Sequence, residues 1–131
     1  GQALINGGPA FSLSFVGSGT AGVTFALSDI PQGTLTGFTG ITATIPTAAG
    51  LGPVFGITVD TLTYDAYYLQ PTPAAGSPIH WIAGVPNVFP AVPFIIPAGD
   101  LAALGGQTWD IVALAFGPNV FLGSNVVRFV W

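Results

Sequence analysis

The chain of 131 residues contains no cysteine, methionine, lysine or glutamate, and it has a single arginine. The absence of cysteine excludes a disulfide framework and thiol chemistry. The absence of Glu, Lys and Met removes most of the good helix formers apart from Ala and Leu. Because one Arg cannot neutralise a phosphate backbone, we expect no nucleic-acid partner.

Long hydrophobic runs are also missing. The most apolar interval, residues 79–96, is interrupted by Pro86, Pro90 and Pro93, so nothing reaches the 18 or so apolar residues of a membrane-spanning helix. We therefore expect no transmembrane segment. Disorder is excluded as well, because half of the chain is hydrophobic and 12% is aromatic.

Glycine and proline are abundant instead, with 19 and 12 copies, and Val, Ile, Thr and aromatic residues fill the intervals between them. This pattern predicts an all-β, single-domain antiparallel β-sandwich of about eight strands, jelly-roll or immunoglobulin-like, with at most one short helical turn. That turn is expected within residues 98–106, with Asp100 as its N-cap. Residues 1–9 are Gly-rich and predict a flexible N-terminal arm, and residues 10–131 form the domain.

The longest β-type run is residues 54–69, which contain no proline and many β-branched and aromatic side chains. The apolar alternation changes phase after Asp60, as it does where a β-bulge inserts one residue. The run therefore predicts a long bent strand with its kink near Asp60.

Residues 10–16 give the clearest amphipathic strand pattern, with Phe11, Leu13 and Phe15 on one face and serines on the other. Because this strand follows an expected arm, we predict that it can add to the sheet of a neighbouring subunit and insert these three side chains there. The alternative is an ordinary edge strand of its own domain.

The C-terminal part predicts a hairpin of residues 108–116 and 120–131 around Gly117-Pro118-Asn119. The sole cation, Arg128, is expected to pair with Asp110 across this hairpin. The proline-punctuated residues 86–97 predict an edge strand, a bulged crossing or an apolar loop over the core.

Catalytic and cofactor signatures are weak, so we expect no enzyme and no cofactor. Asp60 and Asp65 could reach one surface and bind Ca²⁺ or act as a glycosidase pair, but exposed strand aspartates more often only discourage edge pairing. No Gly-x-Ser-x-Gly motif accompanies His80. We therefore predict a partly buried strand histidine bonded through one ring nitrogen.

A group of aromatic residues could form a sugar-stacking platform, as in carbohydrate-binding modules. Few Asn and Gln accompany these rings to supply the hydrogen bonds that such a platform needs. The candidate platform consists of Tyr64, Tyr67, Tyr68 and Trp81.

Only six side chains are charged, and the formal net charge is −4. A folded chain of this mass exposes about 6,000 Å², so the surface is poorly protected against association. We therefore predict a non-enzymatic structural subunit that assembles with copies of itself into an extracellular filament or surface layer, with N-terminal strand exchange as the hypothesised mechanism.

The alternatives are a virion capsid or decoration protein, a carbohydrate-binding module, or a soluble monomer with an uncharged polar coat. In composition the chain is similar to small β-sandwich subunits of extracellular filaments and to jelly-roll virion proteins. A Cys-free, Lys-free β domain fits an extracellular or cell-surface protein, or a virion. No signal-like segment begins the chain, so any export signal is expected to lie outside this sequence or to have been removed.

Overall fold

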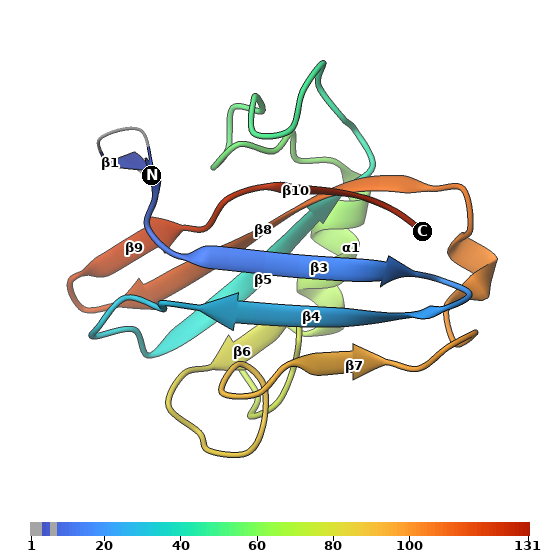
Figure 1. Ribbon diagram of the computed structural model, residues 1–131. Helices are drawn as coiled ribbons and strands as arrows, with labels where there is room; N and C mark the ends of the chain where they lie inside the picture. Colours follow the sequence, from blue (N-terminus) through green and yellow to red (C-terminus); the bar gives the residue numbers. More distant parts are fainter. Residues whose placement is uncertain (1–3, 6–7) are drawn as a thin grey trace.

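The computed structural model describes residues 4–5 and 8–131, and side chains from residue 10 onward. Two antiparallel sheets pack face to face, so the predicted β-sandwich is confirmed (Figure 1). One sheet has the order β10-β8-β5-β6, with β9 also beside β8, and the other has the order β3-β4-β7. Their strands are β3 (Ser12–Ser18), β4 (Gly22–Ser28), β5 (Thr36–Thr42), β6 (His80–Ile82), β7 (Phe94–Ile96), β8 (Thr108–Gly117), β9 (Val120–Gly123) and β10 (Val127–Val130).

The core lies between the two sheets and is built from alternate residues of their strands. Phe15 stands near its centre, with its ring centroid 5.4 Å from that of Phe25, 4.7 Å from Phe129 and 5.7 Å from Trp131. Three odd-numbered residues of β8, Ile111, Ala113 and Ala115, face this core and are fully buried. The period-two alternation of the strands thus places one face of each in the core.

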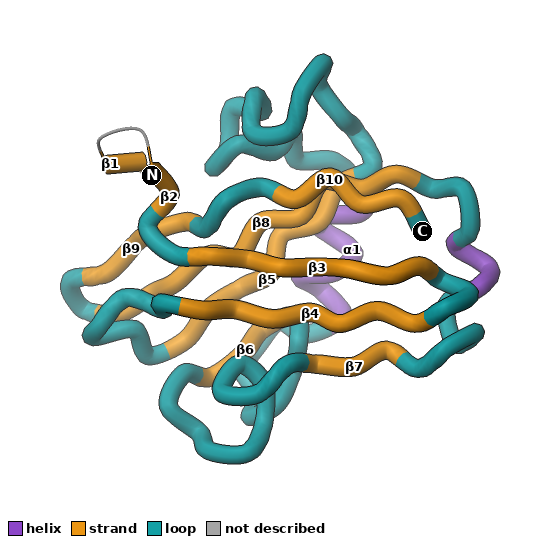
Figure 2. Tube along the Cα trace, in the orientation of Figure 1, coloured by secondary structure: helices purple, strands orange, loops and turns teal. Residues whose placement is uncertain are grey.

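The other face of the five-stranded sheet is covered by a helix, α1 (Thr61–Leu69), and by the loop that precedes it (Figure 2). On this face Asp110 is fully buried, and both of its carboxylate oxygens accept hydrogen bonds from Arg128, at 2.8 and 2.9 Å. The predicted pairing of these two residues is therefore confirmed. The only Lys or Arg side chain of the sequence, Arg128, is thus engaged in this ion pair.

The two sheets are joined at one corner by Asn125. Strands β9 and β10 pair with the same edge of β8 and are separated by the short segment that holds Ser124 and Asn125. The Asn125 side chain accepts a hydrogen bond from the Leu13 N–H at 2.7 Å and donates one to the Leu13 carbonyl at 3.0 Å. This side chain therefore pairs with the outer edge of β3 as a peptide group of a neighbouring strand would.

The predicted bent strand over residues 54–69 is wrong. Residues 61–69 form α1, which starts with a capping box: the Asp60 carboxylate accepts from the Thr63 N–H, and the Thr63 hydroxyl accepts from the Asp60 N–H. The β propensity of the tyrosines is a weak preference, and here the cap and the packing of the helix on β5 override it. Asp60 caps a helix and does not kink a strand.

The predicted helical turn within residues 98–106 is a single 3₁₀ turn, Ala102–Leu104. Leu101 occupies its N-cap without a side-chain hydrogen bond, so the assignment of Asp100 as the cap is wrong. Leu101 and Leu104 pack against the core and Gly105 ends the turn, as expected.

The predicted N-terminal arm falls partly outside the described residues, which omit residues 1–3 and 6–7. In the described part, β1 (Leu4–Ile5) pairs with β2 (Gly8–Pro9) in a two-stranded antiparallel ladder.

The proline-rich residues 86–97 behave as predicted. They contain the short edge strand β7 and a loop that inserts Phe89 into the core, with 2% of its surface exposed.

Candidate binding groove on helix α1

Helix α1 is held at its start by the Asp60 carboxylate. One carboxylate oxygen accepts from the N–H groups of Ala43 and Thr44, both at 3.0 Å, and from the Thr44 hydroxyl at 2.8 Å. Partial burial acts to raise the pKa of Asp60, but hydrogen bonds from the Thr44 hydroxyl and from the N–H groups of Thr63 and Ala43 outweigh it, so the pKa is lowered. Asp60 therefore carries its charge beside the first turn.

Three contacts fix the helix against the sheet. The Thr63 hydroxyl donates to the Ile41 carbonyl at 2.7 Å, and Ala66 is the one helix residue that is buried. After the last turn, the Gln70 carbonyl lies 3.1 Å from Nδ1 of His80 on β6. His80 is half-buried and bonded through one ring nitrogen, as the sequence predicted.

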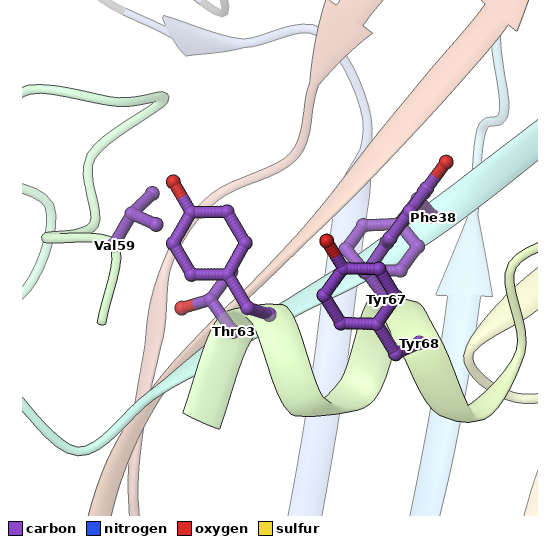
Figure 3. A pocket seen from close by; sticks show the side chains of 6 residues that line it. Phe38, Val59, Thr63, Tyr67 and Tyr68 are labelled. Atoms are coloured by element: carbon purple, nitrogen blue, oxygen red, sulfur yellow. The ribbon is translucent and has the colours of Figure 1, made fainter. Parts of the chain in front are cut away.

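A groove of about 370 Å³ opens between the helix, β5 and the segment before the helix. Figure 3 shows Tyr67 projecting from α1 beside Phe38 of β5, with Val59 on the other side of Thr63. The groove is lined by Phe38, Val59, Thr63, Tyr64, Tyr67 and Tyr68.

Aromatic contacts order the rings of this groove. The Tyr67 ring meets the Phe38 ring edge-to-face at 5.9 Å and the Tyr68 ring at 5.6 Å. Behind Phe38, the His80 ring packs edge-on at 5.9 Å. Nevertheless the tyrosines stay open to solvent, since Tyr64, Tyr67 and Tyr68 are 57%, 45% and 72% exposed.

The four residues of the predicted platform do not all come together. Tyr64, Tyr67 and Tyr68 share the groove, but Trp81 faces the core on the opposite side of the sheet and is fully buried. Its indole packs against Gly37, where any Cβ would overlap the ring. Including Trp81 in the platform was therefore wrong, because β6 turns His80 outward and Trp81 inward.

Phe11, Leu13 and Phe15, predicted to insert into a neighbouring subunit, lie in the core of their own chain, and β3 pairs with β4 over seven residues. This arrangement corresponds to the alternative of an ordinary strand of the same domain. The structure describes one chain, so exchange of this strand between copies stays a prediction.

The titratable side chains are scattered. Among the described residues, no three of His, Cys, Asp and Glu gather where they could hold a metal ion. Asp65 is exposed on α1, whereas Asp60 is engaged in its cap. Neither helix in the described part of the chain is long and apolar enough to cross a membrane.

No protein-family model, curated protein or solved structure matches this chain.

Sequence reasoning missed Phe38, Val59 and the helix that brings the tyrosines together. A signal was available, because Asp60-Thr-Leu-Thr63 has the spacing of a capping box. The tyrosines at 64, 67 and 68 then follow the spacing of one helix face. Phe38 could be placed in the groove only through the pairing of β5 with β6 and its contact with α1.

Proposed function

We propose that this chain is a non-enzymatic structural subunit that assembles with copies of itself, outside the cell, in a filament or surface layer. The observation that carries the proposal is the outer face of the three-stranded sheet. Among the described residues, this face carries no charged side chain. We call it the neutral face; it consists of Ser12, Ser14, Val16, Thr24, Ala26, Ser28 and Ile95.

The neutral face has apolar side chains where a solvated sheet usually carries charge. Val16 and Ile95 are each 58% exposed, and each lies opposite Thr24 in the ladders. An exposed sheet face of this kind is open to association. Contact with a second copy would remove both side chains from water.

The distribution of charge supports a copy of the same chain as the partner. Asp110 and Arg128 neutralise one another, and Asp60 is engaged in the helix cap. The remaining aspartates, Asp29, Asp65 and Asp100, lie outside the neutral face. Two copies with a net charge of −4 repel one another, and this repulsion is weakest when the surfaces that meet carry no charge.

A second apolar surface lies on the opposite side of the sandwich. Leu51, Val54 and Phe121 are 66%, 43% and 54% exposed. The Phe121 ring packs against Phe55 at 5.0 Å and against Phe116 at 5.4 Å, on the outer face of the five-stranded sheet. If this surface contacts the neutral face of another copy, the contact is head-to-tail and generates an open filament unless its rotation closes a ring.

The test is the size of the particles in solution. We expect the wild-type mass, measured by light scattering after size exclusion, to rise with concentration, and filaments to form in negative-stain micrographs. Val16→Glu and Ile95→Glu place a charge on the neutral face and should shift the population to monomers. Thr72→Glu, in an exposed loop away from that face, is the matched control.

Unchanged melting temperatures would show that the two Glu variants still fold. A wild-type chain that stays monomeric at millimolar concentration would refute the proposal. Closed particles of fixed mass would instead favour the capsid or decoration alternative.

A further inference from the structure

We propose that the groove on α1 is a binding site for a quaternary ammonium group. The groove combines four aromatic rings, three of them phenols, with the aliphatic side chain of Val59 and the hydroxyl of Thr63. Its volume of about 370 Å³ falls in the range of small-ligand pockets. Assembly through the neutral face neither requires nor excludes this site, so the two proposals can fail separately.

The polar groups of the groove decide against a sugar. The Thr63 hydroxyl already donates to the Ile41 carbonyl and accepts from the Asp60 N–H. Among the described lining residues this leaves only the phenol groups of the tyrosines, so a pyranose would lose most of its hydrogen bonds with water. A quaternary ammonium has no N–H to satisfy, and aromatic faces attract it without any hydrogen bond.

The charges around the groove favour a cation. Asp60 lies between the lining residues Val59 and Thr63, and Asp65 is exposed on the same helix. The chain's only Lys or Arg side chain, Arg128, is held by Asp110. Tyr67 and Tyr68 also lie in the last turn of the helix, where the carbonyl ends carry partial negative charge. Nothing described here would attract an anion.

The same charges also indicate which kind of molecule carries the ammonium group. A phosphate beside the ammonium would bring negative charge to a protein of net charge −4 that has no free Lys or Arg. We therefore assign the site to a small, phosphate-free solute such as choline and not to a phospholipid headgroup.

The experiment is saturation-transfer NMR of choline with the wild-type chain, which works for monomers and for large assemblies. The matched probe is 3,3-dimethylbutan-1-ol, which replaces the nitrogen of choline by carbon and has no charge. We expect strong transfer to the choline methyl groups and much weaker transfer to the neutral alcohol. Phosphocholine should bind more weakly than choline, and phosphatidylcholine vesicles should not sediment the protein.

Substitutions then locate the site. Tyr64→Leu and Tyr68→Leu keep apolar bulk but remove the ring, and each should weaken choline binding about two- to fivefold. Tyr64→Phe and Tyr68→Phe keep the aromatic face and should restore binding close to the wild-type level. Leu35→Ala, at an exposed residue outside the groove lining, is the control. Melting temperatures would confirm that every variant folds.

Equal binding of choline and its neutral isostere would overturn the proposal, as would choline binding that neither Leu substitution weakens. Binding of a neutral oligosaccharide that the Phe variants abolish would assign the groove to a glycan instead. Phosphocholine binding tighter than choline binding would overturn the choice of a phosphate-free solute.

Discussion

Asp60 connects two parts of the chain through one carboxylate. It caps α1 through the Thr63 N–H and also accepts hydrogen bonds from Ala43 and Thr44 after β5. The residue thereby holds both the first turn of the helix and the loop that follows β5. Since its pKa is lowered in the folded chain, folding favours the ionised form.

The lowered pKa of Asp60 predicts a small dependence of stability on pH, with the chain less stable in acid. The contribution of Asp60 to stability is complete above the unfolded-state pKa, about 3.9, and is lost as the pH falls through the lower folded-state pKa. Above this window the melting temperature should change little. Asp60→Asn, which cannot ionise, should be less stable at neutral pH and should converge with the wild type as the pH falls below the folded-state pKa of Asp60.

Thermal unfolding followed by circular dichroism from pH 7 to pH 2 measures this convergence. Thr61→Ala, at an exposed position in the first turn, should keep the wild-type pH profile. If the melting temperatures of the wild type and Asp60→Asn changed with pH in parallel, ionised Asp60 would not be the source of this pH dependence. Asp60→Ala, which also removes the cap, should lower the free energy of unfolding at pH 7 by about 1 kcal/mol.

A different prediction concerns the ion pair of Arg128 with Asp110, because Asp110 is fully buried. Arg128→Met leaves the Asp110 carboxylate in the interior without its cation, and such a change is costly. The double variant Asp110→Asn/Arg128→Met also removes the buried, unpaired negative charge and should recover part of the lost stability. Urea unfolding of the two single variants and the double variant measures this coupling, and a purely additive result would contradict it.

At the scale of elements, Asn125 decides how the two sheets meet. Its side-chain amide pairs with Leu13 at the outer edge of β3, and Ser124 continues the pairing with β8 through its own N–H and hydroxyl. The interruption between β9 and β10 is thus a corner of the sandwich. A neighbouring chain would have to displace Asn125 before it could pair with this part of β3.

Asn125→Ala should therefore loosen the N-terminal strand. The substitution leaves the Leu13 N–H and carbonyl without their partners and should cost about 1–3 kcal/mol. Amide hydrogen exchange should accelerate at Leu13. Asn119→Ala, in the exposed turn before β9, is the control and should change neither property. Unaltered exchange at Leu13 would show that the Asn125 amide does not hold the strand.

At the scale of the whole molecule, the neutral face and the apolar surface around Phe121 lie on opposite sides of the sandwich, and β3 contributes to the core of its own chain. This arrangement favours assembly by contact between these two surfaces over assembly by strand exchange. Strand exchange instead requires β3 to leave seven pairs with β4 and to withdraw three buried side chains from the core. The same seven pairs would then form between copies.

A cysteine pair distinguishes these two modes of assembly. Ser14 and Ala26 are cross-strand partners on the neutral face, and the wild-type chain has no cysteine. If β3 stays in its own chain, oxidised Ser14→Cys/Ala26→Cys should run as a monomer on a non-reducing gel. A ladder of covalent oligomers from assembled protein would demonstrate strand exchange. Ser14→Cys alone is the control for random cross-linking.

Much of the sandwich could be predicted from the chain alone. The alternation of Phe11, Leu13 and Phe15 with serines predicts which face of β3 is buried, because successive strand residues point to opposite sides. The Arg128–Asp110 pair was predictable because the chain offers one cation and a hairpin register that places an aspartate opposite it. The binding groove was only partly predictable, because its tyrosines were assigned to a strand.

Composition and alternation by themselves determined that this chain folds into antiparallel strands around one aromatic core and that its surface has few charges. Tertiary structure decided between a strand and a helix for residues 61–69, since Asp60 needs Ala43 and Thr44 as well as Thr63 to complete its hydrogen bonds. It also decided that Trp81 is buried while three tyrosines share a groove with Phe38. Local preference is weak where distant segments supply the hydrogen bonds and the packing, and there the folded contacts determine the outcome.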